Sequence, residues 1–160
     1  MLTADASALV ESLKKAEQEI QRRLIGMVNK FARDFVESAV SKTPIGDSQK
    51  FASYYQARTT LPQVEGLSRG NWQIKHTPDF QTLLIAGQAS GEAAADQSEL
   101  YMQANYKLGD TFYVGNATPY IQALENNSSV QTDRQGISSP TIELVTRIYQ
   151  QRLDDYYKQS

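Results

Sequence analysis

The sequence contains no cysteine, a single histidine and no long run of apolar residues. Without cysteine the chain can form neither a disulfide scaffold nor a thiolate metal site, and it has no cysteine nucleophile. The longest apolar run, Leu83 to Ala86, is far shorter than the roughly 20 residues that a bilayer-spanning helix needs. The N-terminus carries Asp5 and lacks the apolar core of a secretory signal. We therefore expect a soluble intracellular protein.

Residues that usually carry chemistry are also sparse. The 16 basic and 18 acidic residues leave a net charge of −2, which argues against a dedicated nucleic-acid binder, because such proteins usually carry a basic face. His76 has no second histidine with which to form a metal site, so we expect a surface or turn histidine. Gly66 and Gly70 are not followed by the Lys-Ser or Lys-Thr of a phosphate loop. We expect no enzyme, no cofactor and no bound metal.

What the chain does have is helical periodicity at both ends. From residue 3 to 42, apolar residues recur in steps of three and four and form one stripe, made of Leu9, Leu13, Ala16, Ile20, Leu24, Met27, Phe31 and Phe35. Thr43 and Pro44 end this helix, because the residue before proline avoids the α region. At ~1.5 Å per residue the helix is about 55–60 Å long, more than the diameter of a small domain. We expect either a bend at Gly26 or a helix that projects and packs on a neighbouring subunit.

A small sheet is predicted in the middle of the chain. Alternating apolar residues and flanking turn residues indicate strands at 71–75, 81–86 and 110–114. A helix rich in Ala, Glu and Gln is favoured from about 91 to 106. Because this helix has few large apolar residues before Leu100, we expect it to pack at the periphery.

The C-terminal part reads as a last helix over residues 140–157, with a stripe made of Ile142, Val145, Ile148 or Tyr149, and Leu153. No linker or repeat divides the chain, so we predict a single domain over 1–160. Its predicted class is α+β, with the long N-terminal helix and the C-terminal helix packed on a small, mainly antiparallel sheet whose core lies in 43–131.

The segment after the third predicted strand reads as a proline turn, a short helix and a polar loop. Asn116 and Pro119 supply the turn chemistry, since Asn tolerates left-handed backbone and Pro presets φ for a helix start. Tyr120 and Leu124 give the short helix an apolar edge, which suits either this chain's core or a neighbouring subunit. Glu125 is harder to place in a core, because a buried carboxylate needs a partner.

Three motifs in this order resemble the neck, or tail-completion, proteins of tailed bacteriophages. They read Thr43-Pro44-Ile45-x-Asp47, then Gly70-Asn71-Trp72-Gln73, then Asn116-x-x-Pro119-Tyr120-Ile121-x-x-Leu124-Glu125-Asn126 followed by Ser129-x-Gln131. The resemblance runs from about Val10 to Gln131, and its third motif is the most specific. The chain departs from the family by inserting most of 48–65 between the first two motifs, by carrying Asn127 where Gly is usual, and by a predicted helix after the third motif.

The resemblance implies a non-enzymatic structural protein of the virion, located at the head–tail junction and assembled in the cytoplasm of the host bacterium. Such proteins form a ring, commonly a hexamer, between the head connector with its portal-associated proteins and the tail tube or tail terminator. Genomic DNA passes through the lumen without specific binding, and no membrane is involved. An acidic lumen would repel the phosphate backbone and let DNA slide.

The resemblance also implies which residues serve assembly. The expected subunit or partner contacts are Asn116, Pro119, Tyr120, Leu124, Glu125 and Gln131, and the expected structural motif residues are Thr43, Pro44, Asn71, Trp72 and Gln73. The alternative within the structural class is a tail terminator or a minor capsid-associated protein. A metal-dependent DNA-packaging nuclease and an assembly chaperone are alternatives from other classes.

Overall fold

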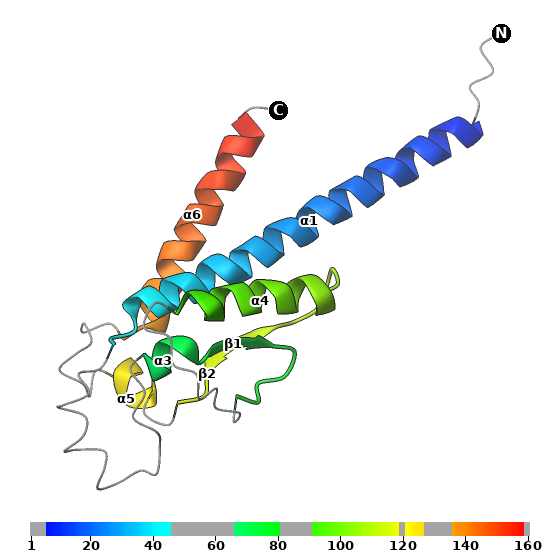
Figure 1. Ribbon diagram of the computed structural model, residues 1–160. Helices are drawn as coiled ribbons and strands as arrows, with labels where there is room; N and C mark the ends of the chain where they lie inside the picture. Colours follow the sequence, from blue (N-terminus) through cyan, green and yellow to red (C-terminus); the bar gives the residue numbers. More distant parts are fainter. Residues whose placement is uncertain (1–5, 46–65, 81–90, 119–120, 127–135, 159–160) are drawn as a thin grey trace, which may run out of the picture.

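A computed structural model describes residues 6–45, 66–80, 91–118, 121–126 and 136–158 of the chain, apart from a few side chains (Figure 1). These residues form an α+β structure that is mainly helical and contains one two-stranded antiparallel sheet. The predicted strand at 81–86 and three predicted contact residues lie outside the described residues, namely Pro119, Tyr120 and Gln131.

The N-terminal helix, α1, spans Ala6–Lys42 without interruption, so Gly26 does not end or break it. Figure 1 shows the helix as one long rod whose N-terminal half projects beyond the rest of the structure. The helix therefore projects, as the second sequence-based alternative has it, and its packing on a neighbouring subunit stays a prediction. No helix among the described residues is long and apolar enough to cross a membrane.

The core face of α1 is not the stripe of large apolar residues. The buried residues of this helix are Asn29, Ala32, Val36, Ala39 and Val40. At 100° per residue, these lie on a different side of the helix from Leu13, Ile20 and Leu24, all of which are exposed. The stripe that the sequence presents most clearly is thus uncovered over the N-terminal half of α1.

Helix α4, Glu92–Asn105, packs along the C-terminal half of α1 (Figure 1). Its predicted position is confirmed, but the expectation of peripheral packing is wrong. The buried residues of α4 are mostly small, namely Ala94, Ala95, Ser98 and Met102, whereas Leu100 is 64% exposed. Gly91, just before α4, has φ +66°, and a Cβ there would clash with the side chain of Val40. Small side chains therefore let the two helices approach closely.

The sheet pairs β1, Trp72–Lys75, with β2, Tyr113–Asn116, and places Trp72 opposite Asn116. Trp72 and Ile74 are buried on one face, as their alternation predicts. The third predicted strand is shifted, because pairing begins at Tyr113 rather than at Asp110. Just before β1 the chain forms the one-turn helix α3, Leu67–Gly70.

The C-terminal helix, α6, spans Ser138–Lys158 and follows α5, Ile121–Glu125. It packs on the C-terminal half of α1, where the rings of Phe31 and Tyr149 meet edge to face with centroids 5.0 Å apart. Val145 is buried, but Ile142, Ile148 and Leu153 of the predicted stripe are substantially exposed. Towards the C-terminus of α6 the two helices diverge, as Figure 1 shows.

Candidate functional site

The first two motifs meet at one hydroxyl group. Thr43 is fully buried, and its Oγ1 donates to the carbonyl oxygen of Ala39 at 2.7 Å. The indole Nε1 of Trp72 donates to the same Oγ1 at 2.9 Å. A hydroxyl can donate once and accept twice, so one side chain ends α1 and also satisfies the polar atom of the buried tryptophan. Arg69 Nε donates to the Thr43 carbonyl oxygen at 2.6 Å.

The second and third motifs meet around α3. Asn116 Nδ2 donates to the carbonyl oxygen of Ser68 at 2.7 Å, while its Oδ1 accepts from the backbone N–H and the hydroxyl of Thr118 at 2.9 and 2.7 Å. Ser68 Oγ and Thr118 Oγ1 lie 3.2 Å apart. Asn71 is fully buried, and its Nδ2 donates to the carbonyl oxygen of Leu67 at 2.7 Å. We call Thr43, Ser68, Asn71, Trp72, Asn116 and Thr118 the motif cluster.

The motif cluster is buried in all but one of its residues, and Asn116 is half-buried. Buried polar groups are costly unless they are hydrogen-bonded, so a connected network of this kind specifies one arrangement of the segments it joins. Pro44 and Gln73, the other motif residues named from the sequence, are half-buried beside it in the chain.

Two of the predicted contact residues in the third motif serve this chain itself. Leu124 is 3% exposed and belongs to the hydrophobic core. The carboxylate of Glu125 accepts hydrogen bonds from the backbone N–H groups of Ile137 and Ser138 at 3.0–3.1 Å and from the Ser138 hydroxyl. An acidic group is favourable at a helix N-terminus, so Glu125 caps α6. Gly136 sits against it with φ +70°, and a Cβ there would lie 2.5 Å from the Glu125 carbonyl oxygen.

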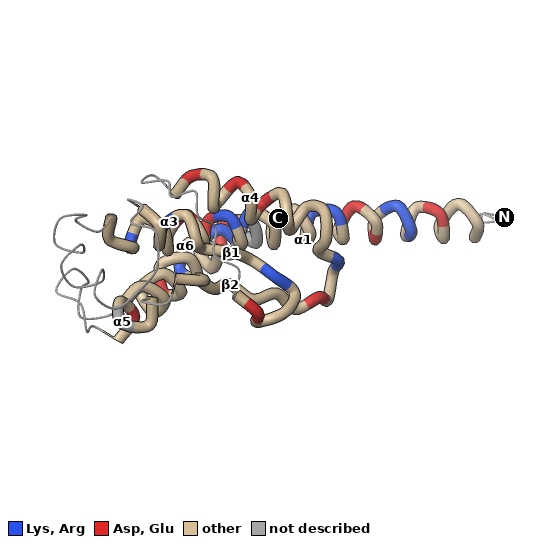
Figure 2. The backbone as a smooth tube through the Cα atoms, turned by 60° about the horizontal axis from the view of Figure 1, so that its bottom comes forward, with Lys and Arg blue, Asp and Glu red and all other residues tan. Residues whose placement is uncertain are grey.

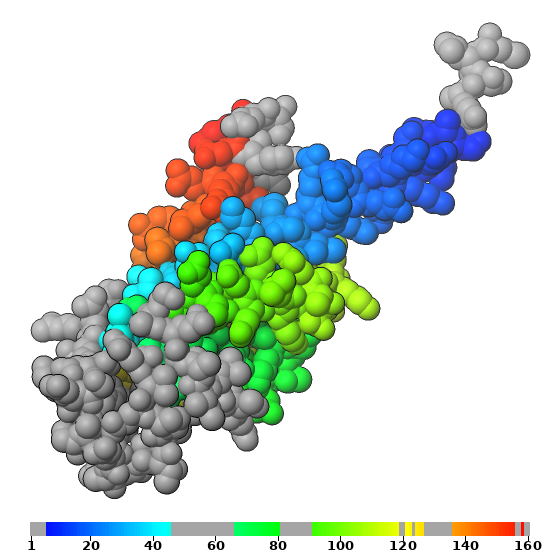
Figure 3. Space-filling view, viewed as in Figure 1, coloured from blue at the N-terminus to red at the C-terminus, as the bar shows by residue number. Residues whose placement is uncertain are grey.

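Residues 6–27 of α1, which we call the arm, form the most exposed part of the described structure. Figure 3 shows the arm standing clear of the other elements. Apart from the half-buried Glu19 and Ile25, every residue of the arm is exposed. Its exposed large apolar side chains are Leu9, Val10, Leu13, Ile20, Leu24 and Met27. Apart from Val10, these side chains lie along one side of the arm at 100° per residue.

Charged residues of both signs follow one another along the arm (Figure 2). Lys15 pairs with Glu11 at 2.9 Å, and Glu19 pairs with Arg22 and Arg23 at 2.8 and 2.7 Å. Hydrogen bonds from Arg22 and then Arg23 hold the pKa of Glu19 below its usual value. These pairs support the exposed helix but are worth little individually in water.

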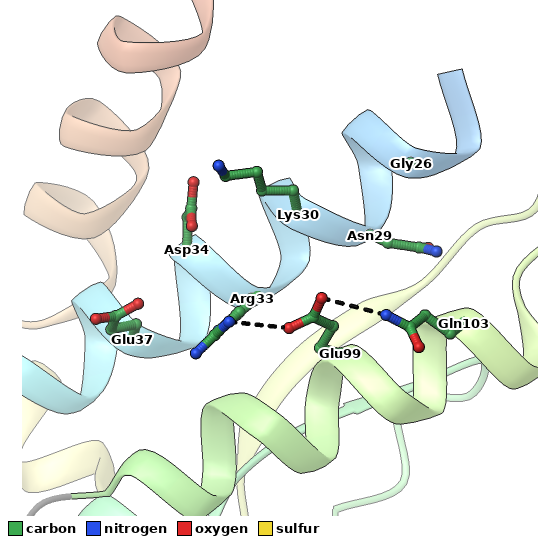
Figure 4. Close-up of a pocket in the computed structure, with 8 residues that line it drawn as sticks. All are labelled: Gly26, Asn29, Lys30, Arg33, Asp34, Glu37, Glu99 and Gln103. Carbon is green, nitrogen blue, oxygen red and sulfur yellow. Dashed lines mark hydrogen bonds and ion pairs between the residues drawn. The ribbon is translucent and has the colours of Figure 1, made fainter. Parts of the chain in front are cut away.

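A polar hollow of about 600 Å³ lies beside the C-terminal half of α1 (Figure 4). Within it Arg33 bridges to Asp96 and Glu99 of α4, both at 3.1 Å. On the other side, Asp34 accepts from Tyr149 Oη at 3.0 Å and contacts Arg152 at 3.4 Å. Each of these carboxylates is engaged by a cation or a hydroxyl, so the arrangement ties α4 and α6 to α1. No group of three or more potential metal-ligating side chains occurs among the described residues.

His76 directly follows β1, and its ring contacts two other segments of the chain. Its Nδ1 lies 3.1 Å from the carbonyl oxygen of Thr111 and its Nε2 lies 3.3 Å from that of Asn105, while its ring contacts Tyr101. The histidine therefore joins the end of α4 to the approach to β2, consistent with the expected turn histidine.

Sequence reasoning missed the motif cluster as a unit and the capping role of Glu125. The motif cluster joins positions up to 50 residues apart, and Glu125 lies 13 residues before the helix it caps. Local spacing therefore gives no signal for either. In the comparisons with known proteins, the chain matches no family model, no curated protein and no solved structure.

Proposed function

We propose that this chain is a neck, or tail-completion, component of a tailed bacteriophage that forms a ring between the head connector and the tail tube. The observation that carries the proposal is the motif cluster. Three motifs that resemble this family lie far apart in the sequence, yet Thr43 bonds directly to Trp72, and Asn116 bonds to the helix preceding Trp72. A shared structural unit explains why such motifs occur together and in this order.

The surfaces of the molecule are suited to assembly. A ring needs a patch on each subunit that fits a different patch on the next subunit. The arm has an exposed apolar surface that projects away from the other helices and the sheet, and α6 carries further exposed apolar residues. The net charge of −2 also suits a protein that lines a passage for DNA, because attraction to phosphate would hold the genome back.

The test is made on virions of the phage whose genome encodes this sequence. Quantitative mass spectrometry is expected to find the chain at the copy number of a ring, and electron microscopy is expected to place it at the head–tail junction. Absence from finished virions would overturn the proposal and favour an assembly chaperone. Cleavage of DNA by the purified protein with a divalent cation would favour a packaging nuclease instead.

A further inference from the structure

We propose that the arm of one copy docks antiparallel along α6 of a second copy of this chain, with Leu13 opposite Leu153 and Leu24 opposite Ile142. This inference deepens the proposed ring and rests on it only in requiring that copies meet. It identifies the two surfaces that meet and the direction in which they run.

The first argument is continuity with an interface that already exists within the chain. Leu9, Ile20 and Phe31 are spaced by 11 residues, and so are Leu13, Leu24 and Phe35. Eleven residues make just over three turns of an α-helix, so each series stays close to one line of the helix. At the C-terminal end of the first line, Phe31 packs on Tyr149 of α6. The apolar lines of the arm therefore continue the surface on which α1 packs against its own α6.

Its own α6 does not cover the arm, because the C-terminal part of α6 diverges from α1 (Figure 1). Leu13 and Ile20 consequently remain 61% and 58% exposed. The missing neighbour is a helix with apolar residues at matching intervals, which is what a second α6 provides.

The second argument is that α6 carries a complementary uncovered surface. Ile142 and Leu153 are 53% and 42% exposed. They are 11 residues apart, the same interval that separates Leu13 from Leu24. At 100° per residue both lie on one flank of Val145, which is buried. The arm and α6 also match in length, at about 33 and 31 Å for ~1.5 Å per residue.

Two observations indicate the direction. At 100° per residue, an antiparallel arrangement brings Lys14, beside Leu13 in the arm, onto the same flank of the contact as the exposed Asp154, beside Leu153 in α6. It also reproduces the antiparallel relation of α1 and α6 within the chain, where both outer ends point the same way in Figure 1. Because the arm and α6 are different patches, the contact is heterologous and leaves an arm free for the next copy. Such contacts produce a closed ring or an open filament.

The first experiment compares two double variants of the full chain by sedimentation velocity at rising concentration. The wild type is expected to self-associate. Leu13→Glu with Leu24→Glu is expected to weaken association on the order of tenfold or more, because a charge enters an apolar contact. Ala8→Glu with Gln18→Glu adds the same charge to exposed positions on the other side of the arm and is expected to associate like the wild type. Unchanged circular dichroism in both variants excludes misfolding.

A wild-type protein that stays monomeric into the millimolar range would overturn the inference. Equal association by the two double variants would do the same. These measurements need only the purified protein. Self-association of a chain that is absent from virions would preserve this inference and overturn the proposed function, whereas a monomeric chain present at the head–tail junction would do the reverse.

The second experiment identifies the surfaces and uses the natural absence of cysteine. Glu17→Cys in the arm and Thr146→Cys in α6 each introduce one exposed thiol. A short bis-maleimide is expected to cross-link a mixture of the two variants into heterodimers, and to leave Glu17→Cys alone largely uncross-linked. Efficient homodimers of Glu17→Cys would instead show that arm meets arm, which would overturn the assignment to α6.

Discussion

The two halves of α1 share one continuous helix and have opposite surroundings. In the C-terminal half, Ala32, Val36 and Ala39 are fully buried against the rest of the structure. In the arm, Leu9 and Leu13 are each 61% exposed although they are larger and more apolar. Burial in this protein therefore follows from how closely a neighbouring helix can approach, and the size of an apolar side chain does not predict it. The large residues of the arm are available for a contact with another molecule.

The most direct test of this difference is to place the same substitution, alanine to glutamate, in both halves of α1. Ala32→Glu would put a carboxylate into a fully buried site of the hydrophobic core, so we expect a loss of more than about 3 kcal/mol in the free energy of unfolding, or failure to fold. Ala16→Glu, in the exposed arm, is expected to change it by less than about 0.5 kcal/mol. Urea denaturation followed by circular dichroism measures both values. Equal destabilisation by the two variants would mean that the two halves of α1 do not differ in burial.

The next largest expected loss of stability concerns Thr43, which directly follows the C-terminal half of α1. Thr43→Val keeps the shape of the side chain but leaves the Trp72 indole N–H without its acceptor in a buried site, so we expect a loss of about 1–3 kcal/mol. Ser41→Ala is the control, because its hydroxyl also bonds to a helix carbonyl oxygen but is exposed. Its expected cost is below about 0.5 kcal/mol. Similar losses for both hydroxyl groups in urea denaturation would argue against the Trp72 bond.

Glu125 lies at the N-terminal end of α6, just as Thr43 lies at the C-terminal end of α1, and its role there can be tested in the same way. Glu125→Gln removes the negative charge that caps the first turn of α6, and we expect a cost of about 1 kcal/mol. Glu143→Gln, an exposed residue further along the same helix, is the matched control with a small expected effect. Thermal unfolding compares the two. A larger loss in Glu143→Gln would contradict the capping role and leave Glu125 available for a contact between subunits.

The main helices could be predicted from sequence, and the surfaces that they bury could not. Periodicity placed α1, α4 and α6 to within a few residues, because each is long and bounded by clear turn residues. The same periodicity selected the large residues of α1 as its packing face. Ala32 and Ala94 give no comparable signal, since alanine is common on every face of a helix, and whether small residues lie at a close helix crossing depends on the partner helix.

The motif residues illustrate the same limit. The resemblance grouped Thr43, Trp72 and Asn116 by their order in the chain, but their hydrogen bonds depend on how α1, α3 and the two strands assemble. Leu124 could be either a core residue or a contact residue on sequence alone, because an apolar side chain suits both. Its burial in the described structure favours the core.

The smallest predicted effect concerns Tyr149, in the part of α6 that packs on α1. Burial, together with the hydrogen bond to Asp34, raises the pKa of Tyr149 to about 12. An unfolded tyrosine titrates near pH 10, so the protonated form is favoured in the folded state, and its contribution is complete below about pH 10 and lost as the pH rises towards 12. Tyr149→Phe is expected to cost about 0.5–1 kcal/mol at neutral pH, at the low end for a hydrogen bond because the site is partly exposed.

The difference in unfolding free energy between wild type and Tyr149→Phe should therefore narrow between about pH 10 and 12. Tyr113→Phe, which removes a hydroxyl from an exposed tyrosine of β2, is the control for loss of a ring hydroxyl. Urea denaturation at a series of pH values measures both. A constant difference for Tyr149→Phe would mean that its hydroxyl does not hold α6 to Asp34 of α1.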